Sequence, residues 1–249
     1  MTLDGDFPRA PLPIAVARAD CFPSTHLTQL LGEIRTVQLD PSRSELTAAH
    51  RRLAEQVMLR YAAPLEVYAK GSPLRDIAEP AELVHGYFAS AFADSEYFAR
   101  YQASGMRLRR WLMNGLLLHA RGVARDRARA ARREGASLDA VAAPHAVDAS
   151  AEQAFDRAWA LAILSEACTS VEGALLAEGR DRAWTVFRRH AIDGRSYVEL
   201  EPELGLGRQQ MADLVRSVTR RVRARILEML EAEGGDSAEE LRDVIRLVT

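Results

Sequence analysis

The sequence predicts an all-α fold made of two helical domains joined by a flexible linker. Alanine, leucine, arginine and glutamate dominate the chain, and clusters of β-branched residues are short. Apolar residues recur at spacings of three and four, with hardly any strict alternation. The segment 134–150, which contains Gly135 and Pro144, has little periodicity and divides the helical pattern in two. Such a segment is typical of an interdomain linker.

Before the linker, the sequence predicts an N-terminal arm and a first helical domain. Residues 1–43 form the predicted arm and extension, whose opening part is extended because prolines cluster at Pro8, Pro11 and Pro13. Residues 44–133 form the predicted helical domain, with an interruption near Gly71–Pro73.

After the linker, residues 151–233 are predicted to form the second helical domain. The stretch Ser150–Gln153 fits a capping box that opens a helix. Apolar residues then repeat every four positions, at Phe155, Trp159, Ile163, Ala167 and Val171. The last segment, 234–249, is acidic with a helical pattern, and it could pack on its own domain or bind a partner.

The most informative pattern lies near the end of the second domain. Ser196–Leu204 is predicted to be a short helix, Gly205–Gly207 a tight turn, and the stretch from Arg208 to about Glu231 a longer helix. This is the layout of a helix-turn-helix. On the longer helix, at about 100° per residue, one side carries Met211, Val215, Val218 and Val222, and the opposite side carries Gln209, Asp213, Arg216 and Arg220. Because Arg and Gln suit bidentate contacts with base edges, this face predicts DNA binding.

The net charge of −2 conceals two strongly basic stretches. Residues 107–133 carry nine Arg against Asp126 alone, residues 208–225 carry six Arg against Asp213, and the rest of the chain carries −15. On a helix, the first stretch places Arg107, Arg121, Arg125, Arg129 and Arg132 on one side with Trp111, Asn114 and Leu118, opposite Leu112, Leu116, Ala120 and Val123. This side could follow a phosphate backbone and touch unpaired bases. The alternative is a solvated Arg face that reflects genomic base composition.

No motif for catalysis, metal or cofactor binding is present. The six histidines have no His-Glu-x-x-His spacing, the two cysteines no Cys-x-x-Cys spacing, and no Gly-x-x-x-x-Gly-Lys loop occurs. Cys168 is expected to be a core residue, and Cys21 and Cys168 are too few for a disulfide framework. No apolar run approaches the ~18 residues of a membrane helix. We expect a cytoplasmic, non-enzymatic protein without a cofactor.

Several short stretches, in a fixed order along most of the chain, point to one family: Phe22–Thr25, Glu82–Phe88, Phe155–Leu161, Tyr197–Arg223 and Glu239–Arg242. Their order and spacing resemble the bacterial extracytoplasmic-function (ECF) RNA polymerase sigma factors of the sigma-70 family, in particular planctomycete-type members with C-terminal extensions. The resemblance implies a protein that is monomeric when free. It also implies binding to core RNA polymerase, at the β′ clamp helices and the β flap of the polymerase. Promoter DNA is the second implied partner, and many members of the family also bind an anti-sigma factor.

The resemblance also implies three groups of site residues. Polymerase contacts would be Glu82, Leu83, His85 and Phe88. Contacts with the −10 promoter element would be Arg107, Arg110, Trp111, Asn114, Arg121, Arg125 and Arg129. Contacts with the −35 element would be Arg208, Gln209, Gln210, Asp213, Arg216, Ser217, Arg220 and Arg221.

One departure from the family keeps other functions open. Family members carry Lys-Asn or Arg-Asn in the middle of the basic helix and an aromatic residue one to two turns later, whereas this chain has Leu117-Leu118 and Val123-Ala124. The chain could be a helix-turn-helix regulator, or a sigma-like protein that no longer initiates transcription. A third alternative is an interaction module whose Arg faces bind an acidic partner.

Overall fold

The computed structural model describes residues 43–133, 149–232 and 237–248. All of the regular structure in these residues is helical, which confirms the predicted all-α class. The first helices along the chain are α2 (Arg43–Gly71), the 3-10 turn η1 (Pro73–Asp76), α3 (Pro80–Phe92), α4 (Tyr97–Ser104) and α5 (Leu108–Arg133). They are followed by α6 (Ala149–Ala177), α7 (Asp181–Phe187), the π-helical turn η2 (Arg188–Ile192), α8 (Tyr197–Leu204), α9 (Arg208–Ala232) and α10 (Ser237–Val248).

The chain divides into two compact units. In the described residues, the first unit contains 43–133 and 149–159, and the second contains 160–232 and 237–248. The division therefore lies within α6, although the sequence assigned residues 151–159 to the second domain. The predicted arm and almost all of the predicted linker lie outside the described residues.

The first residues of α6 belong to the first unit because their apolar face packs on α2. The indole N–H of Trp159 donates a hydrogen bond to the Tyr61 hydroxyl at 3.2 Å, and both side chains are buried. The rings of Phe155 and Tyr68 form a T-shaped pair, with 6.4 Å between ring centroids. The four-residue repeat predicted for this helix is confirmed, since Phe155, Trp159, Ile163 and Ala167 are all 0% exposed. The helix begins at Ala149, so Ser150 is its second residue and not the predicted cap.

The core of the first unit lies between α2, α3 and α5. The break predicted near Gly71–Pro73 is confirmed by the end of α2 and the short turn η1, which Ser72 caps through its side chain. Two further breaks, before α4 and before α5, are not in the predicted pattern. Gly105 ends α4 with φ of +65°, a left-handed conformation that glycine adopts at no steric cost.

The crossing of α3 and α5 is close because glycine stands at the contact. A Cβ atom added to Gly115 would lie 2.3 Å from the Tyr87 hydroxyl oxygen. That hydroxyl is buried and lies 2.6 Å from the Tyr97 hydroxyl, so α3, α4 and α5 meet at this point. Burial raises the pKa of both tyrosines, which keeps their hydroxyls neutral.

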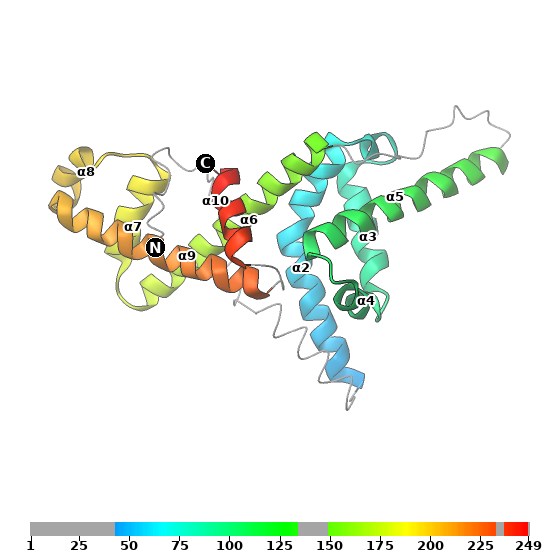
Figure 1. Ribbon diagram of the computed structural model, residues 1–249, viewed down its shortest axis with the longest axis horizontal. Helices are drawn as coiled ribbons and strands as arrows, with labels where there is room; N and C mark the ends of the chain where they lie inside the picture. The colour runs from blue at the N-terminus through cyan, green and yellow to red at the C-terminus, as the bar shows by residue number, and fades with distance from the viewer. Residues whose placement is uncertain (1–42, 134–148, 233–236, 249) are drawn as a thin grey trace. The chain divides into compact units, whose positions relative to one another are not determined.

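The C-terminal half of α5 extends beyond the body of the first unit (Figure 1). Ala120 is its last buried residue, and every later position up to Arg133 is half-buried or exposed. The segment 121–133 is therefore a helix with little tertiary support, made mainly of arginine and alanine.

The second unit is built around α7, α8 and α9, with α10 packed against α9. Leu241 and Val244 of α10 are 4% and 1% exposed, which decides between the two alternatives predicted for the tail. The tail packs on its own unit, through the side of α10 that carries these two residues.

One helix in the described residues, α6, is long and apolar enough to cross a membrane by length and composition. Its apolar residues do not form one continuous run, since Arg157, Glu166 and Glu172 interrupt them. Core helices of globular proteins pass the same test, and the large apolar side chains of α6, Phe155, Trp159 and Ile163, are fully buried.

Candidate nucleic-acid interface

The two helices α8 and α9 are joined by a three-residue turn whose geometry is fixed by capping. Ser196 precedes α8, where its backbone N–H donates to the Glu199 carboxylate at 2.8 Å and its hydroxyl accepts from the Glu199 N–H at 3.3 Å. This is a capping box. The Ser196 hydroxyl also donates to the Glu199 carboxylate, at 3.0 Å, and the two hydrogen bonds that this carboxylate accepts from Ser196 lower the pKa of Glu199. At the other end, Gly205 closes the helix with φ of +60°.

The start of α9 is capped by a side chain from its own first turn. The Gly207 N–H donates to the Gln210 side-chain oxygen at 3.2 Å, and the Met211 N–H donates to the Gly207 carbonyl at 3.0 Å. Gln210 thus serves one of the backbone donors that a helix start leaves without an internal partner. The start of α9 at Arg208 agrees with the boundary predicted from the sequence.

One side of α9 is buried against α7 and α8, as predicted. Met211, Val218 and Val222 are each 1% exposed or less, and Val215 is half-buried. Met211 forms a small core with Val186 and Leu200, and Tyr197, Leu204, Leu206 and Leu214 pack around it. Because these side chains are buried, the opposite side of α9 is the one that faces away from the core.

The opposite side of α9 is exposed and polar. The predicted contacts Arg208, Gln209, Gln210, Asp213, Arg216 and Arg220 are all exposed or half-buried, and Ser217 is half-buried. Two of these guanidinium groups already have carboxylate neighbours. Arg208 contacts Glu201 at 2.8 Å, and Arg216 pairs with Asp213 one turn earlier. These pairs are exposed, so water screens them and a phosphate can compete for the arginines.

Arg221, also predicted to contact DNA, has a different role in the structure. Its guanidinium donates to both carboxylate oxygens of Glu178, at 2.8 and 2.9 Å. This bidentate pair joins α9 to the residue that follows α6, and it lowers the pKa of Glu178. Arg221 is half-buried and engaged within its own unit, so it is held more firmly than the exposed arginines of α9, and its predicted contact with DNA stays a prediction.

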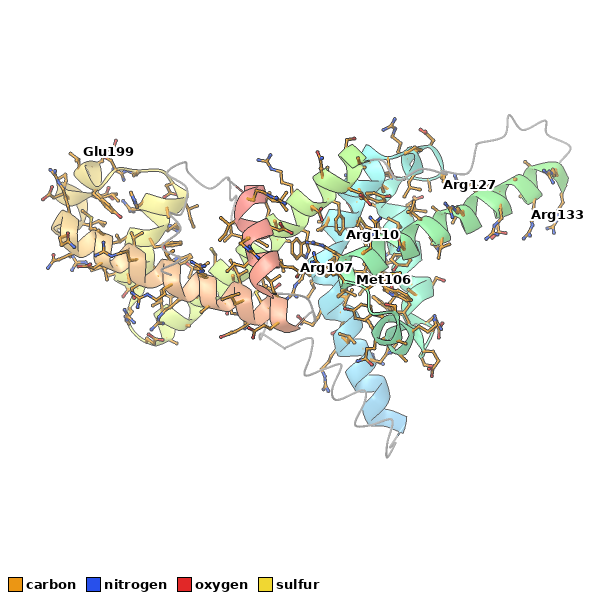
Figure 2. The ribbon with its side chains drawn as sticks, viewed as in Figure 1. Met106, Arg107, Arg110, Arg127, Arg133 and Glu199 are labelled. Carbon is orange, nitrogen blue, oxygen red and sulfur yellow. The ribbon has the colours of Figure 1, made fainter. Side chains whose placement is uncertain are left out.

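The predicted −10 contacts at the start of α5 are mostly engaged within the first unit. Arg110 pairs with Glu152 of α6, and the Asn114 side-chain amide lies 3.9 Å from the Met106 sulfur. Trp111 is half-buried, and its ring lies 5.9 Å from Tyr97 and 6.1 Å from Tyr101, between centroids. The ring of Trp111 thus packs in this aromatic cluster and stays partly exposed, and its predicted contact with DNA stays a prediction. Figure 2 shows Met106, Arg107 and Arg110 close together at this end of α5.

The predicted contacts farther along α5 are more accessible. Arg121 is half-buried, whereas Arg125 and Arg129 are exposed, and Arg129 lies 3.2 Å from Asp126. Three further arginines at the end of the helix, Arg127, Arg132 and Arg133, are exposed and form no ion pair with a residue that the structure describes. Figure 2 shows Arg127 and Arg133 on the part of α5 that extends outward. Arg127 and Arg133 are absent from the predicted set, although their position in the basic stretch is visible in the sequence.

The predicted polymerase contacts divide into two residues at the surface and two buried residues. Glu82 and His85 are exposed, whereas Leu83 and Phe88 are each 2% exposed. The positions 83, 84, 87 and 88 form the apolar face that α3 buries against the rest of the unit. The structure corrects the prediction for Leu83 and Phe88, which are core residues and not surface contacts.

The remaining chemically reactive groups add no second candidate site. Cys168 is 1% exposed, and burial raises the pKa of its thiol to about 12, as expected for a core residue. Within the described part of the chain, no group of three or more His, Cys, Asp or Glu side chains could hold a metal ion.

Comparison with known proteins adds no relative. No model of a protein family matches the chain, and neither a curated protein sequence nor a solved structure matches it significantly.

Proposed function

We propose that the chain is an ECF-type sigma factor, which binds core RNA polymerase and directs it to promoters. The observation that carries the proposal is the two-sided geometry of α9. Its apolar side is buried to Met211, Val218 and Val222, and its opposite side presents Gln209, Arg216 and Arg220 at the surface after a tight, capped turn. In a helix-turn-helix, such a polar side enters the major groove and reads base edges.

The second feature that supports the proposal is the basic helix α5. It belongs to the other compact unit, and its exposed arginines can neutralise phosphates. A promoter has two separated elements, so a sigma factor needs two DNA-binding surfaces. In this proposal α9 contacts the −35 element, α5 contacts the −10 element, and the protein is cytoplasmic and monomeric when free.

Polymerase would dock on the exposed side of α3. Glu82 and His85 lie on that side, one turn apart, whereas Leu83 and Phe88 support it from the core. This surface is smaller than the one the sequence predicted, which favours a second candidate function. That candidate is a helix-turn-helix regulator that binds DNA without polymerase.

Retention of core RNA polymerase by the tagged chain tests the proposal. We expect wild type to retain polymerase at moderate salt and Glu82→Arg to lose most of it, because charge reversal places a repulsive group within the docking surface. Glu55→Arg is the matched control, since Glu55 is an exposed carboxylate in the same unit but on α2. The control should retain polymerase as wild type does.

One result would contradict the sigma-factor proposal, and another would contradict only docking through α3. If wild type retains no polymerase but shifts duplex DNA by itself, the regulator replaces the sigma factor. If Glu82→Arg and Glu55→Arg retain polymerase equally, docking does not use α3. Transcription from promoters selected with the holoenzyme would then separate an initiating sigma factor from a sigma-like protein that only binds.

A further inference from the structure

A single large apolar side chain is exposed among the arginines of α5. Leu118 is 63% exposed, whereas Leu108, Leu112 and Leu116 of the same helix are 2% exposed or less. At about 100° per residue, Leu118 lies on the same side of the helix as Asn114, Arg121 and Arg125. Packing against the residues that the structure describes therefore does not explain why this position is leucine.

A glycine one turn later leaves open space beside Leu118. A Cβ atom added to Gly122 would meet no described atom within 4 Å. The two glycines at the crossing of α3 and α5, Gly86 and Gly115, differ, because a Cβ there would press against His119 or Tyr87. A helix is less stable with glycine than with alanine at an interior position. No described residue needs the space that Gly122 leaves, which favours a close approach to this position by a binding partner.

We propose that Leu118 is a wedge that inserts between neighbouring base pairs of DNA, and that Gly122 lets the DNA come close to the helix beside it. This inference rests on the proposed function, because it takes DNA to be the ligand of α5. Apolar side chains that enter a base step partly unstack it and kink the duplex. The exposed Arg125 and the neighbouring Arg121 would hold phosphates on either side of the opened step.

The surroundings of Leu118 favour DNA over an acidic protein. A protein interface has a central apolar area to which several side chains contribute, surrounded by a polar rim. Here one leucine stands among a half-buried amide and guanidinium groups. A lone apolar side chain with cationic neighbours is the arrangement that enters a base step, since the cations bind the backbone and the apolar group replaces a stacked base.

The wedge also gives a role to the departure of this helix from the sigma-factor pattern. Trp111 packs against Tyr97 and Tyr101 and is half-buried, so only part of its ring is open to an unpaired base. Leu118 is the exposed apolar group that α5 offers in the middle of its length. Opening of DNA would then begin with unstacking by a leucine.

Fluorescence of 2-aminopurine tests the wedge. The probe is a duplex of about two helical turns with a central TA step, which unstacks readily, and with 2-aminopurine in place of one adenine of that step. Its fluorescence rises when the base unstacks, and fluorescence anisotropy on an end label reports binding separately. The full-length chain is used at low salt, where phosphate contacts are strongest.

We expect wild type to raise the 2-aminopurine signal severalfold at saturation. Leu118→Ala and Gly122→Leu should lose most of that rise while anisotropy still shows binding, and Leu118→Phe should keep it. Leu59→Ala is the matched control, because Leu59 is 61% exposed in the same unit but lies on α2. Circular dichroism of each variant confirms that it is folded.

The wedge is overturned if Leu118→Ala raises the signal as wild type does, if Leu59→Ala loses as much, or if wild type binds the duplex without any rise. It is also overturned if wild type binds no duplex at low salt. Polymerase retention by the same preparations keeps the two proposals separate. A Leu118-dependent rise without polymerase retention supports the wedge and contradicts the sigma factor, and retention without such a rise does the reverse.

Discussion

Two glycines within α5 differ in the space around them, and this space decides whether a side chain could be accommodated at each position. At Gly115 an added Cβ would lie 2.3 Å from the Tyr87 hydroxyl oxygen, whereas at Gly122 it would meet nothing described within 4 Å. Tyr87 cannot move aside easily, because its ring is 3% exposed and its hydroxyl is hydrogen-bonded to that of Tyr97. The same substitution should therefore have opposite effects at the two positions.

We predict that Gly115→Ala lowers the free energy of unfolding by about 1–3 kcal/mol through overpacking, and that Gly122→Ala raises it by about 0.5–1 kcal/mol through helix propensity. Urea unfolding followed by circular dichroism measures both. Adding Tyr87→Phe to Gly115→Ala should recover only part of the loss, because the ring carbons would still lie 2.8 and 2.9 Å from the new Cβ. Equal effects at the two glycines would contradict the close crossing of α3 and α5.

Residue roles that depend on distant partners were the ones the sequence could not predict. Arg221 and Glu178 are 43 positions apart, so nothing local indicates that they pair. Leu83 and Phe88 differ, since the apolar spacing 83, 84, 87 and 88 is visible in the sequence and predicts a buried face. The resemblance to a polymerase-docking helix assigned them a surface role against that spacing, and their burial shows that the spacing was the better guide.

At the scale of elements, helix boundaries were predictable where the capping signals are local. The ends of α8 and the start of α9 follow from Ser196, Glu199 and Gly205, which act within a few positions of themselves. The start of α6 was less predictable, because the helix already includes Ser150. The π-helical turn η2 has no signal of this kind in the sequence, and nothing in the pattern around Arg188–Ile192 predicted it.

The capping box of α8 predicts a pH dependence that belongs to this element. Hydrogen bonds from Ser196 lower the pKa of Glu199 below its ordinary value of 4.5. A carboxylate whose pKa is lower in the folded state stabilises the fold above its ordinary pKa, and this contribution is lost as the pH falls through the folded value. Glu199→Gln can keep the capping geometry, since glutamine also serves in a capping box, but it does not titrate.

We therefore expect wild type to lose more stability than Glu199→Gln on acidification. The difference between their urea midpoints should be constant near neutral pH and should narrow once the pH falls below about 4.5. Other carboxylates with lowered pKa values, such as Asp94 and Glu178, titrate in both proteins and cancel in the comparison. Parallel curves down to about pH 3 would show that the Ser196 hydrogen bonds do not hold the charged carboxylate in solution.

At the scale of the whole molecule, the charge is arranged so that two helices remain basic in a chain of net charge −2. The sequence predicted this arrangement, but it could not show how differently the two helices are neutralised. On α9, carboxylates contact Arg208, Arg216, Arg221 and Arg225. At the end of α5, Arg132 and Arg133 have no such contact with a described residue, because that segment extends away from the body of its unit.

This difference predicts unequal contributions to the salt dependence of DNA binding. Removing one arginine that neutralises a phosphate should reduce the magnitude of the slope of log K against log salt concentration by about 0.9. If Arg132 and Arg133 bind phosphates, replacing both with Gln should reduce that magnitude by about 2. Arg221→Gln should change the slope far less, because Arg221 must first leave Glu178 before it can reach a phosphate.

Titrations of the same duplex between about 50 and 200 mM salt would measure these slopes. Neither substitution in α5 removes an ion pair with a described residue, so the double variant should have the melting temperature of wild type. Any change in its slope then reports on DNA binding alone. Glu178→Gln supplies the converse test, since it weakens the hold on Arg221 and should steepen the slope by up to about 0.9, the effect of one phosphate. If Arg221→Gln flattened the slope as much as the double change in α5, the Glu178 pair would be too weak to keep Arg221 from DNA.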